Sequence, residues 1–243
     1  MMVINAYGLD FKELNAKIRA VGSDCVVEGC IGQRYIGEGL DGVTLKLYGT
    51  PGNTLGGYLN GATIEVFGNA QDEVGDTMNA GRIIVHGNIG DAAGYAMRGG
   101  VICVRGNAGY RTGIHMKEYK DKRPVIIIGG YTGSFLGEYQ AGGVIIVLGL
   151  GGPSPYTGNI VGEFPCTGMH GGKLFLRGRA EGVDFPAQVN VRLAGEEDRA
   201  ELAGHLEIFA YSFGYPLGWL LDSDYTVVTP NTKRPYKQLY VQN

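Results

Sequence analysis

A glycine recurs every nineteen residues through the middle of this chain, and a short apolar run precedes it each time. The clearest members of the series are Gly49, Gly68, Gly87 and Gly106, followed by the pair Gly130 and Gly149. One step back from Gly49 lands on Cys30. A fixed period of this size is typical of a solenoid, in which each repeat forms one coil and buries its apolar side against its neighbours.

The apolar runs have the length and alternation of β-strands. They are rich in β-branched and aliphatic residues, are too short for helices, and are bounded by glycine. The residues four and two positions before each glycine are aliphatic: Leu45/Leu47, Ile64/Val66, Ile83/Val85, Ile102/Val104, Ile145/Val147 and Leu174/Leu176. Because alternate side chains of a strand point to opposite faces, we expect one aliphatic column inward and a mixed column outward.

Further glycines and asparagines fall at fixed places in the period, where a coil has to turn. Glycine accepts the positive φ of such corners without steric cost. Asparagine follows the coil glycine in three consecutive coils, at Asn69, Asn88 and Asn107. We expect these side chains to form a hydrogen-bonded ladder along the stack.

Two coils exceed the period, and their extra residues predict loops. Gly106 to Gly130 spans 24 residues and Gly149 to Gly178 spans 29. Insertions in solenoids commonly emerge on one face, which is often the binding face. We therefore expect a partner interface formed by residues in or beside these loops: Arg111, His115, Met116, Lys117, Tyr119, Tyr156, Met169 and His170.

The two ends of the chain depart from the repeat and predict caps. At the N-terminal end, Asp10 is placed to N-cap an amphipathic helix. At the other end, the acidic run from Glu196 to Asp198 precedes an apolar stripe with helical spacing. The expected divisions are a cap in residues 1–28, a glycine-rich β-helix in 29–190, and a helix, a strand near 225–228 and a basic, proline-containing tail in 191–243.

Composition excludes several classes of function. The net charge is −3, from 21 Lys and Arg against 24 Asp and Glu, and the signs are interspersed, which argues against a nucleic-acid-binding surface. No apolar stretch approaches the ~18 residues that span a bilayer, and no signal peptide is visible. The four cysteines form no C-x-x-C pair. A cytoplasmic protein without a disulfide framework is therefore expected.

Motifs that suggest chemistry have structural explanations. The stretch from Gly37 to Gly42 matches G-x-G-x-x-G, but a strand rather than a helix follows it, which argues against dinucleotide binding. His86 is expected on the surface and His205 in the packing of the C-terminal helix. A metal site near His115 and His170 would need Cys166 or Glu118 as further ligands. Loop anchoring or contact between subunits is the favoured interpretation of both histidines.

Several glycine-containing segments share a recognisable pattern: Gly32-Gln33-Arg34-Tyr35-Ile36-Gly37, Gly68-Asn69-Ala70-Gln71-Asp72, Tyr95-Ala96-Met97-Arg98-Gly99-Gly100, Gly113-Ile114-His115-Met116-Lys117 and Phe135-Leu136-Gly137-Glu138-Tyr139. They resemble the GXGXG domain, the C-terminal β-helix domain of the glutamate synthase large subunit. The resemblance covers nearly the whole chain and is closest to the version encoded as a separate subunit in archaeal-type enzymes. Related chains occur in N-methylglutamate synthase and in formylmethanofuran dehydrogenase.

The resemblance implies an all-β fold, a single-stranded right-handed parallel β-helix of about seven coils with a helical cap at each end. It also implies a non-catalytic scaffold that holds glutaminase and FMN/iron–sulfur synthase subunits together. No catalytic, cofactor-binding or metal-binding residue of that family maps onto this chain, which begins Met1-Met2-Val3 and so lacks the N-terminal cysteine nucleophile. The FMN and the cluster are expected on the partners, and self-association is left open. A different class of function remains, an independent ligand-binding or catalytic β-helix that uses His115 and His170.

Overall fold

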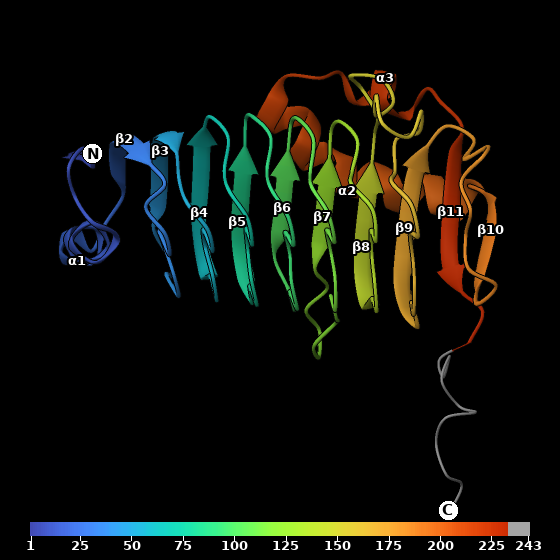
Figure 1. The fold of residues 1–243 in the computed structure, drawn as a ribbon, viewed down its shortest axis with the longest axis horizontal. Coiled ribbons are helices and arrows are strands. Elements are labelled where there is room, and N and C mark those ends of the chain that lie inside the picture. The colour runs from blue at the N-terminus through green and yellow to red at the C-terminus, as the bar shows by residue number, and fades with distance from the viewer. Residues whose placement is uncertain (233–243) are drawn as a thin grey trace, which may run out of the picture.

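The computed structural model describes residues 1–232 and shows an elongated stack of β-coils (Figure 1). Nine strands pair in parallel, each with the next along the chain. They are β1 (Met2–Asn5), β2 (Cys25–Ile31), β3 (Thr44–Thr50), β4 (Asn60–Phe67), β5 (Ala80–Val85), β6 (Val101–Val104), β7 (Val125–Ile128), β8 (Ala141–Val147) and β9 (Gly171–Arg177). Each strand and the turn segment after it form one coil, so the chain is a parallel β-helix, as the glycine period predicts.

The strand register aligns the aliphatic side chains into the predicted inward column. Ile83 pairs with Ile64 on one side and with Ile102 on the other, and the same alignment continues to Ile126, Ile145 and Leu174. All members of this column are buried. Burying a side chain of this size contributes about 1.5–3 kcal/mol, so the stack supplies a continuous core.

The turn segments form the second wall of the core. They are joined from coil to coil by backbone hydrogen bonds, such as Thr54 N–H to Asp72 O at 2.9 Å and Gly75 N–H to Leu55 O at 2.8 Å. Their inward side chains include a buried column at one coil position: Leu59, Met78, Met97, Met116, Gln140 and Met169. The core therefore lies between the sheet and the stacked turns.

One corner position shows why the glycines recur. Gly75 has a φ of +70°, and a Cβ added there would lie 2.5 Å from Cδ1 of Ile102. The last turn segment has Cys166 at the equivalent position, with a φ of +60°. A Cβ added at the equivalent glycine one coil earlier, Gly137, would lie 3.6 Å from the nearest isoleucine atom, Cδ1 of Ile145. Glycine is therefore needed where a following isoleucine fills the corner, and the last coil accepts a larger side chain.

The N-terminal helix α1 (Phe11–Val21) lies at one end of the stack, with Leu14 and Ile18 buried in the core. Asp10 caps it as predicted: its carboxylate accepts from the amides of Lys12 and Glu13, and Glu13 bonds back to the Asp10 amide. The expected boundary between residues 28 and 29 falls inside β2, because β1 and β2 already belong to the sheet.

At the other end, the sheet finishes with two antiparallel strands. β11 (Tyr225–Pro230) pairs with β9, and β10 (Val189–Leu193) pairs with β11. The predicted strand near 225–228 is thus confirmed, while the tail from 233 onward lies outside the described residues.

The long helix α2 (Glu196–Phe213) runs across one face of the strands instead of over the end of the stack (Figure 1). The short helix α3 (Leu217–Leu221) follows it. Leu202, Leu206 and Phe209 of α2 form a second buried cluster with outward strand residues. The outward column changes accordingly, from Lys46 and Glu65 in the first coils to an apolar series under the helix: Cys103, Ile127, Ile146 and Phe175.

The predicted asparagine ladder is present, and its hydrogen bonds run from side chain to backbone. The side-chain oxygen of Asn69 accepts from the backbone amide of Asn88 at 2.8 Å, and Asn88 accepts from the amide of Asn107 at 2.8 Å. The side-chain oxygen of Asn107 accepts from the backbone amide of Tyr131 at 2.9 Å and continues the ladder into the next coil. Each rung thereby satisfies a backbone donor of the next coil.

The two insertions emerge at opposite ends of the strands, which corrects the expectation of a single loop face (Figure 1). The first lies between Lys117 and Val125, just before β7, and contains a short antiparallel bridge between Tyr119 and Lys122. The second lies between Leu150 and Ile160, just after β8. The regular hydrogen bonds of the neighbouring coils resume outside both segments.

Candidate partner-binding surface

The turn segments present one row of side chains from strained backbone positions. At one corner, seven residues other than glycine have φ between 55° and 61°: Tyr35, Thr54, Glu73, Ala92, Arg111, Phe135 and Phe164. This conformation is uncommon for such residues and persists only where the surroundings fix it. The coil-to-coil ladder does so, since the amides of Arg111 and Phe135 donate to Ser134 O at 2.9 Å and to Glu163 O at 2.8 Å.

In the last three turn segments, three aromatic rings and one arginine lie at or next to this corner. We call Tyr110, Arg111, Phe135 and Phe164 the aromatic row. The ring centroids of Tyr110 and Phe135 lie 5.2 Å apart, as do those of Phe135 and Phe164. The guanidinium carbon of Arg111 lies 4.8 Å from the Tyr110 centroid and 5.4 Å from that of Phe135. Phe164 is 55% exposed, and exposed aromatic and arginine side chains are the types that dominate protein interfaces.

A buried carboxylate fixes the arginine of this row. Nε of Arg111 donates to Oε2 of Glu138 at 2.7 Å, and the Glu138 side chain is only 8% exposed. Held between two rings and this carboxylate, the Arg111 side chain loses little conformational entropy when a partner covers it.

His115 lies at the second corner of the same turn segment, with a φ of +56°. Its exposed ring stacks on Tyr139 at 5.1 Å between centroids and meets the edge of Tyr95 at 6.0 Å. His115 therefore lies at a regular corner next to the first insertion and not within it. His170 likewise follows a regular corner, with Nδ1 3.0 Å from Gly168 O.

Two of the predicted contact residues are not on the surface. Met116 and Met169 are fully buried in the methionine-rich core column, so neither side chain reaches a partner in this structure. Lys117 and Tyr119 are exposed on the first insertion. Tyr156, on the second insertion, is 90% exposed.

A cavity of about 410 Å³ connects the second insertion to the aromatic row. Tyr156 and Phe164 both line it, together with the acidic residues Glu163 and Asp184. The cavity thus offers rings and carboxylates beside Phe164, the last member of the aromatic row. This combination suits a partner that supplies apolar and basic side chains.

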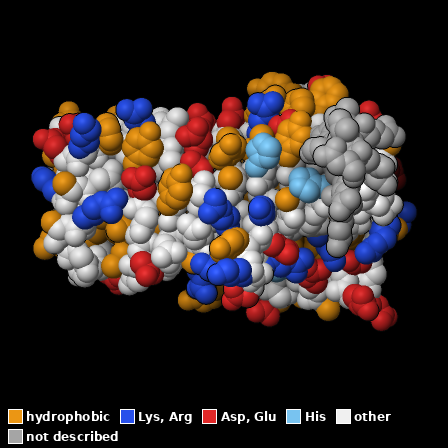
Figure 2. Space-filling view, turned by 90° about the horizontal axis from the view of Figure 1, so that it is seen from below, with side chains coloured by type: hydrophobic (Ala, Val, Ile, Leu, Met, Phe, Trp, Pro, Cys, Tyr) orange, Lys and Arg blue, Asp and Glu red, His pale blue; other side chains and the backbone are white. Residues whose placement is uncertain are grey.

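Phe135, Phe164 and Glu138 were not selected from the sequence. Phe135 stands two residues before Gly137, as Arg111 stands two before Gly113. This shared position relative to the corner glycine could have identified the row from the sequence. The insertions hide it, because the intervals between equivalent residues of the last coils are no longer nineteen. Seen from below, the molecule shows hydrophobic, basic and acidic side chains mixed together, whereas a nucleic-acid-binding face presents a basic stripe (Figure 2).

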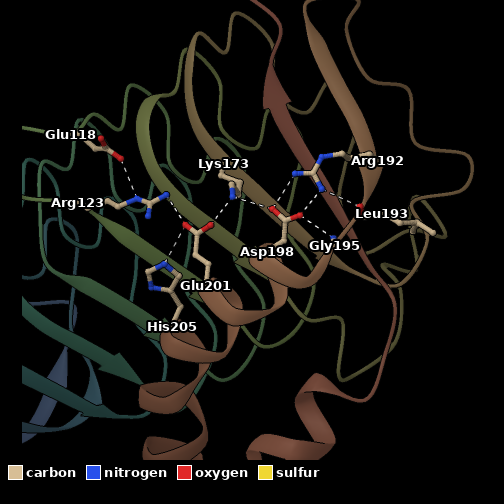
Figure 3. A network of polar contacts seen from close by, with 9 residues as sticks. All are labelled: Glu118, Arg123, Lys173, Arg192, Leu193, Gly195, Asp198, Glu201 and His205. Carbon is tan, nitrogen blue, oxygen red and sulfur yellow. Dashed lines mark hydrogen bonds and ion pairs between the residues drawn. The ribbon is translucent and has the colours of Figure 1, made fainter.

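A network of ion pairs attaches α2 to the coils (Figure 3). Nζ of Lys173 lies 3.1 Å from Oδ1 of Asp198 and 2.6 Å from Oε2 of Glu201. Arg123, on the first insertion, lies 2.7 Å from Glu201 and 3.2 Å from Glu118. Arg192 of β10 pairs with Asp198. The network therefore positions both the helix and the insertion that carries Lys117 and Tyr119.

The network also shifts the ionisation of its members. The hydrogen bond from Arg192, assisted by the Gly195 amide and Lys173, holds the pKa of Asp198 well below its ordinary value. Burial alone would raise the pKa of Glu201, but Lys173 and Arg123 outweigh it and the pKa is lowered. Burial lowers the pKa of His205, whose part in helix packing agrees with the expectation.

The remaining reactive groups are occupied by the fold. All four cysteines are buried and free, and burial raises the pKa of Cys103 and of Cys166 to about 12, which suppresses the reactive thiolate. Oε1 of Glu118 accepts from the Gly143 amide at 3.0 Å. Among residues 1–232, no group of three or more His, Cys, Asp or Glu side chains is arranged to hold a metal ion, and no helix is long and apolar enough to cross a membrane.

These features define the class: a parallel β-helix with glycine at its corners, a helix packed across the outward faces of its strands and a partly exposed aromatic row. The family model described as GXGXG motif matches residues 9–218, so this chain belongs to the GXGXG motif family.

Two further comparisons place the chain among known proteins. An uncharacterised protein of Methanocaldococcus jannaschii is 40% identical over 250 residues, which cover 98% of this chain and 96% of that protein. A chain of the formyltransferase/hydrolase complex of Methylorubrum extorquens, solved in complex with methylofuran, superposes with a TM-score of 0.65. That match covers 91% of this chain and 88% of the other at 21% identity, and it shows a shared fold.

Proposed function

We propose that this chain is a non-catalytic scaffold subunit of a multi-subunit, cytoplasmic glutamate synthase-type complex, which makes glutamate from glutamine and 2-oxoglutarate. It holds together an amidotransferase subunit with glutaminase activity and a synthase subunit that carries FMN and an iron–sulfur cluster. The observation that carries the proposal is the preordered aromatic row on a chain that belongs to the GXGXG motif family.

The distribution of polar and reactive side chains supports a scaffold. The thiols are buried, Asp198 and Glu201 of α2 are paired with arginine and lysine, and the exposed histidine His115 is stacked on Tyr139. The stack itself is joined by the strand ladder and the turn ladder around a packed core. A body of this kind deforms little and keeps two bound subunits at a fixed separation.

A second assignment uses the same scaffold with other partners, as in N-methylglutamate synthase or a formylmethanofuran dehydrogenase-like complex. The observation that favours it is the shared fold with a chain of the formyltransferase/hydrolase complex.

Co-purification decides between these assignments. The tagged full-length chain is expressed at native level in its source organism, isolated with mild salt, and its bound proteins are identified by mass spectrometry. Recovery of amidotransferase and FMN/iron–sulfur synthase subunits is the expected result. Recovery of formyl-transferring subunits would favour the second assignment, and isolation of the chain without any subunit would refute the scaffold proposal.

The aromatic row is tested by a matched pair of substitutions. Phe164→Asn removes an exposed ring, and asparagine tolerates the positive φ of this position. Tyr58→Asn makes the same change at a corner of a distant coil, where φ is +54° and the ring is 53% exposed. We expect Phe164→Asn to weaken partner binding by about tenfold or more, the size of an interface hot spot, and Tyr58→Asn to leave it unchanged.

A further inference from the structure

The two hydrogen-bonded ladders end differently at the N-terminal end of the stack. In the turn ladder, the carbonyls of Asn53 and Gly57 accept from the amides of Tyr35 and Gly39 in the preceding coil. The equivalent carbonyls of the first coil belong to Arg34 and Glu38. They accept from side chains of α1 instead: Asn15 Nδ2 at 3.0 Å and Arg19 Nη2 at 3.0 Å, respectively. Helix α1 therefore closes the turn ladder.

The sheet ladder is not closed in this way. β1 is the terminal strand of the sheet and pairs only with β2 among the described residues. The amide of Ala6 donates to Glu28 O at 2.8 Å. Because backbone groups of successive strand residues point alternately to the two sides, the N–H and C=O groups of Val3 and Asn5 point away from β2. No backbone group of residues 1–232 pairs with them, so in the described part of the chain they form an open edge.

Apolar surface surrounds this edge. Met2 and Val3 are 59% and 57% exposed. A groove of about 510 Å³ runs between β1 and α1, lined by Met2, Val3, Ile4, Asn5, Lys17, Ala20 and Val21. Proteins usually protect an exposed edge strand with lysine, proline or a bulge. The sequence of β1, Met-Val-Ile-Asn, has neither lysine nor proline, and its register with β2 is continuous.

The charge beside the groove indicates what fits it. Lys17, which lines the groove, is exposed on α1 and forms no ion pair with any residue in 1–232. A second copy of this chain, paired through β1, would bring two such basic helices together, which like-charge repulsion opposes. A strand flanked by acidic residues would instead meet complementary charge.

We propose that the β1 edge binds an extended, acid-flanked strand of a partner subunit. The strand pairs with the backbone of Val3 and Asn5, places alternate apolar side chains in the groove, and sets a carboxylate near Lys17. This mode of recognition takes affinity from the backbone and specificity from the groove. The identity of the strand's owner rests on the proposed function, whereas the binding chemistry of the edge does not.

The edge is tested first on the isolated full-length chain. The probe is the peptide acetyl-Glu-Val-Thr-Val-Thr-Val-Glu-amide, compared with the same peptide flanked by lysine. Amide exchange at Val3 and Asn5 is followed by nuclear magnetic resonance. We expect saturating acidic peptide to slow exchange at both amides by about tenfold or more and the lysine-flanked peptide to bind several-fold more weakly. If neither peptide slows exchange, the inference is wrong.

Two variants separate edge pairing from general stability. Val3→Pro removes the outward-pointing N–H and should abolish the effect, and its thermal unfolding midpoint shows whether the fold survives. Lys17→Glu, at an exposed position, should reverse the preference between the two peptides. Tyr7→Ala, which lies beside β1 and is 80% exposed, should change nothing. Slow exchange at Val3 and Asn5 without peptide, together with a dimer in sedimentation, would assign the edge to a second copy and overturn the proposal.

The complex provides the second measurement. Hydrogen exchange of residues 1–6 should be slower in the purified complex than in the isolated chain. Fast exchange there, in a complex that assembles normally, refutes the partner strand while the scaffold function stands. Failure of the wild-type chain to assemble with any subunit refutes the scaffold function, and the peptide result then decides the inference alone.

Discussion

Replacing Gly75 by alanine should destabilise the stack more than the same change at Gly42. Both glycines have positive φ, +70° and +62°, so each alanine would occupy the left-handed region at a cost of about 1–2 kcal/mol. A Cβ at Gly75 would stand 2.5 Å from Cδ1 of Ile102, whereas none of the neighbouring atoms lies within 4 Å of a Cβ at Gly42. Overpacking adds about 1–3 kcal/mol. The expected losses are therefore about 2–5 kcal/mol at Gly75 and about 1–2 kcal/mol at Gly42.

The steric part of this loss should be removable. Ile102→Val deletes the Cδ1 that causes the overlap, and the next atom, Cγ1, lies 3.4 Å from the added Cβ. By itself, Ile102→Val should cost about 0.5–1.5 kcal/mol. In the Gly75→Ala background it should cost nothing or stabilise, because it relieves the overlap. The coupling free energy in a double-mutant cycle should be about 1–3 kcal/mol.

Urea unfolding followed by circular dichroism and by Trp219 fluorescence measures all five proteins, the wild type included. Coincident transitions would justify two-state free energies. The reasoning fails if the two alanine variants lose equal stability, or if Gly75→Ala and Ile102→Val are additive within about 0.5 kcal/mol.

Three further outcomes are expected. Asn88→Ala removes the acceptor of the Asn107 amide and should lower the free energy of unfolding by about 1 kcal/mol, whereas a normal unfolding midpoint would show that the ladder contributes nothing. Because the pKa of Asp198 is lowered in the folded chain, the unfolded chain binds a proton there more readily. The stabilisation from this carboxylate is therefore present above about pH 4 and is lost as the pH falls. In Asp198→Asn, the free energy of unfolding should decrease less steeply with falling pH than it does in the wild type, as measured by unfolding at a series of acid pH values. The four buried thiols should react with a thiol reagent at pH 8 only after denaturation, and rapid reaction of Cys103 or Cys166 in the native chain would contradict the burial that raises each pKa.

Local patterns predicted much of the fold. Period-two alternation identifies the inward residues such as Ile83 and Ile102, and the nineteen-residue spacing places them in one column. Asp10 and Glu13 predict the start of α1, because the capping box joins residues that are only three positions apart in the chain. The asparagine ladder follows from the same spacing. In each case, the interaction joins positions whose separation is fixed by the repeat.

The surface was harder to predict, because it depends on where the repeat is interrupted. Met116 and His115 are neighbours in the chain, yet one is buried in the core and the other exposed at a corner. The spacing located both residues only in or beside the first long loop. The structure puts the extra residues after Lys117, and this one shift in register changes which side chains face outward.

The sequence by itself determined that this chain coils every nineteen residues, which side chains fill the core, and where the first helix begins. Only the tertiary structure decided that α2 covers the outward faces of the strands, that the rings of Phe135 and Phe164 form a row with Arg111, and that β1 is an open edge among the described residues. The first set rests on contacts repeated at a constant separation along the chain. The second rests on single contacts between segments whose distance in sequence follows no rule, and such contacts are fixed only when the whole chain packs.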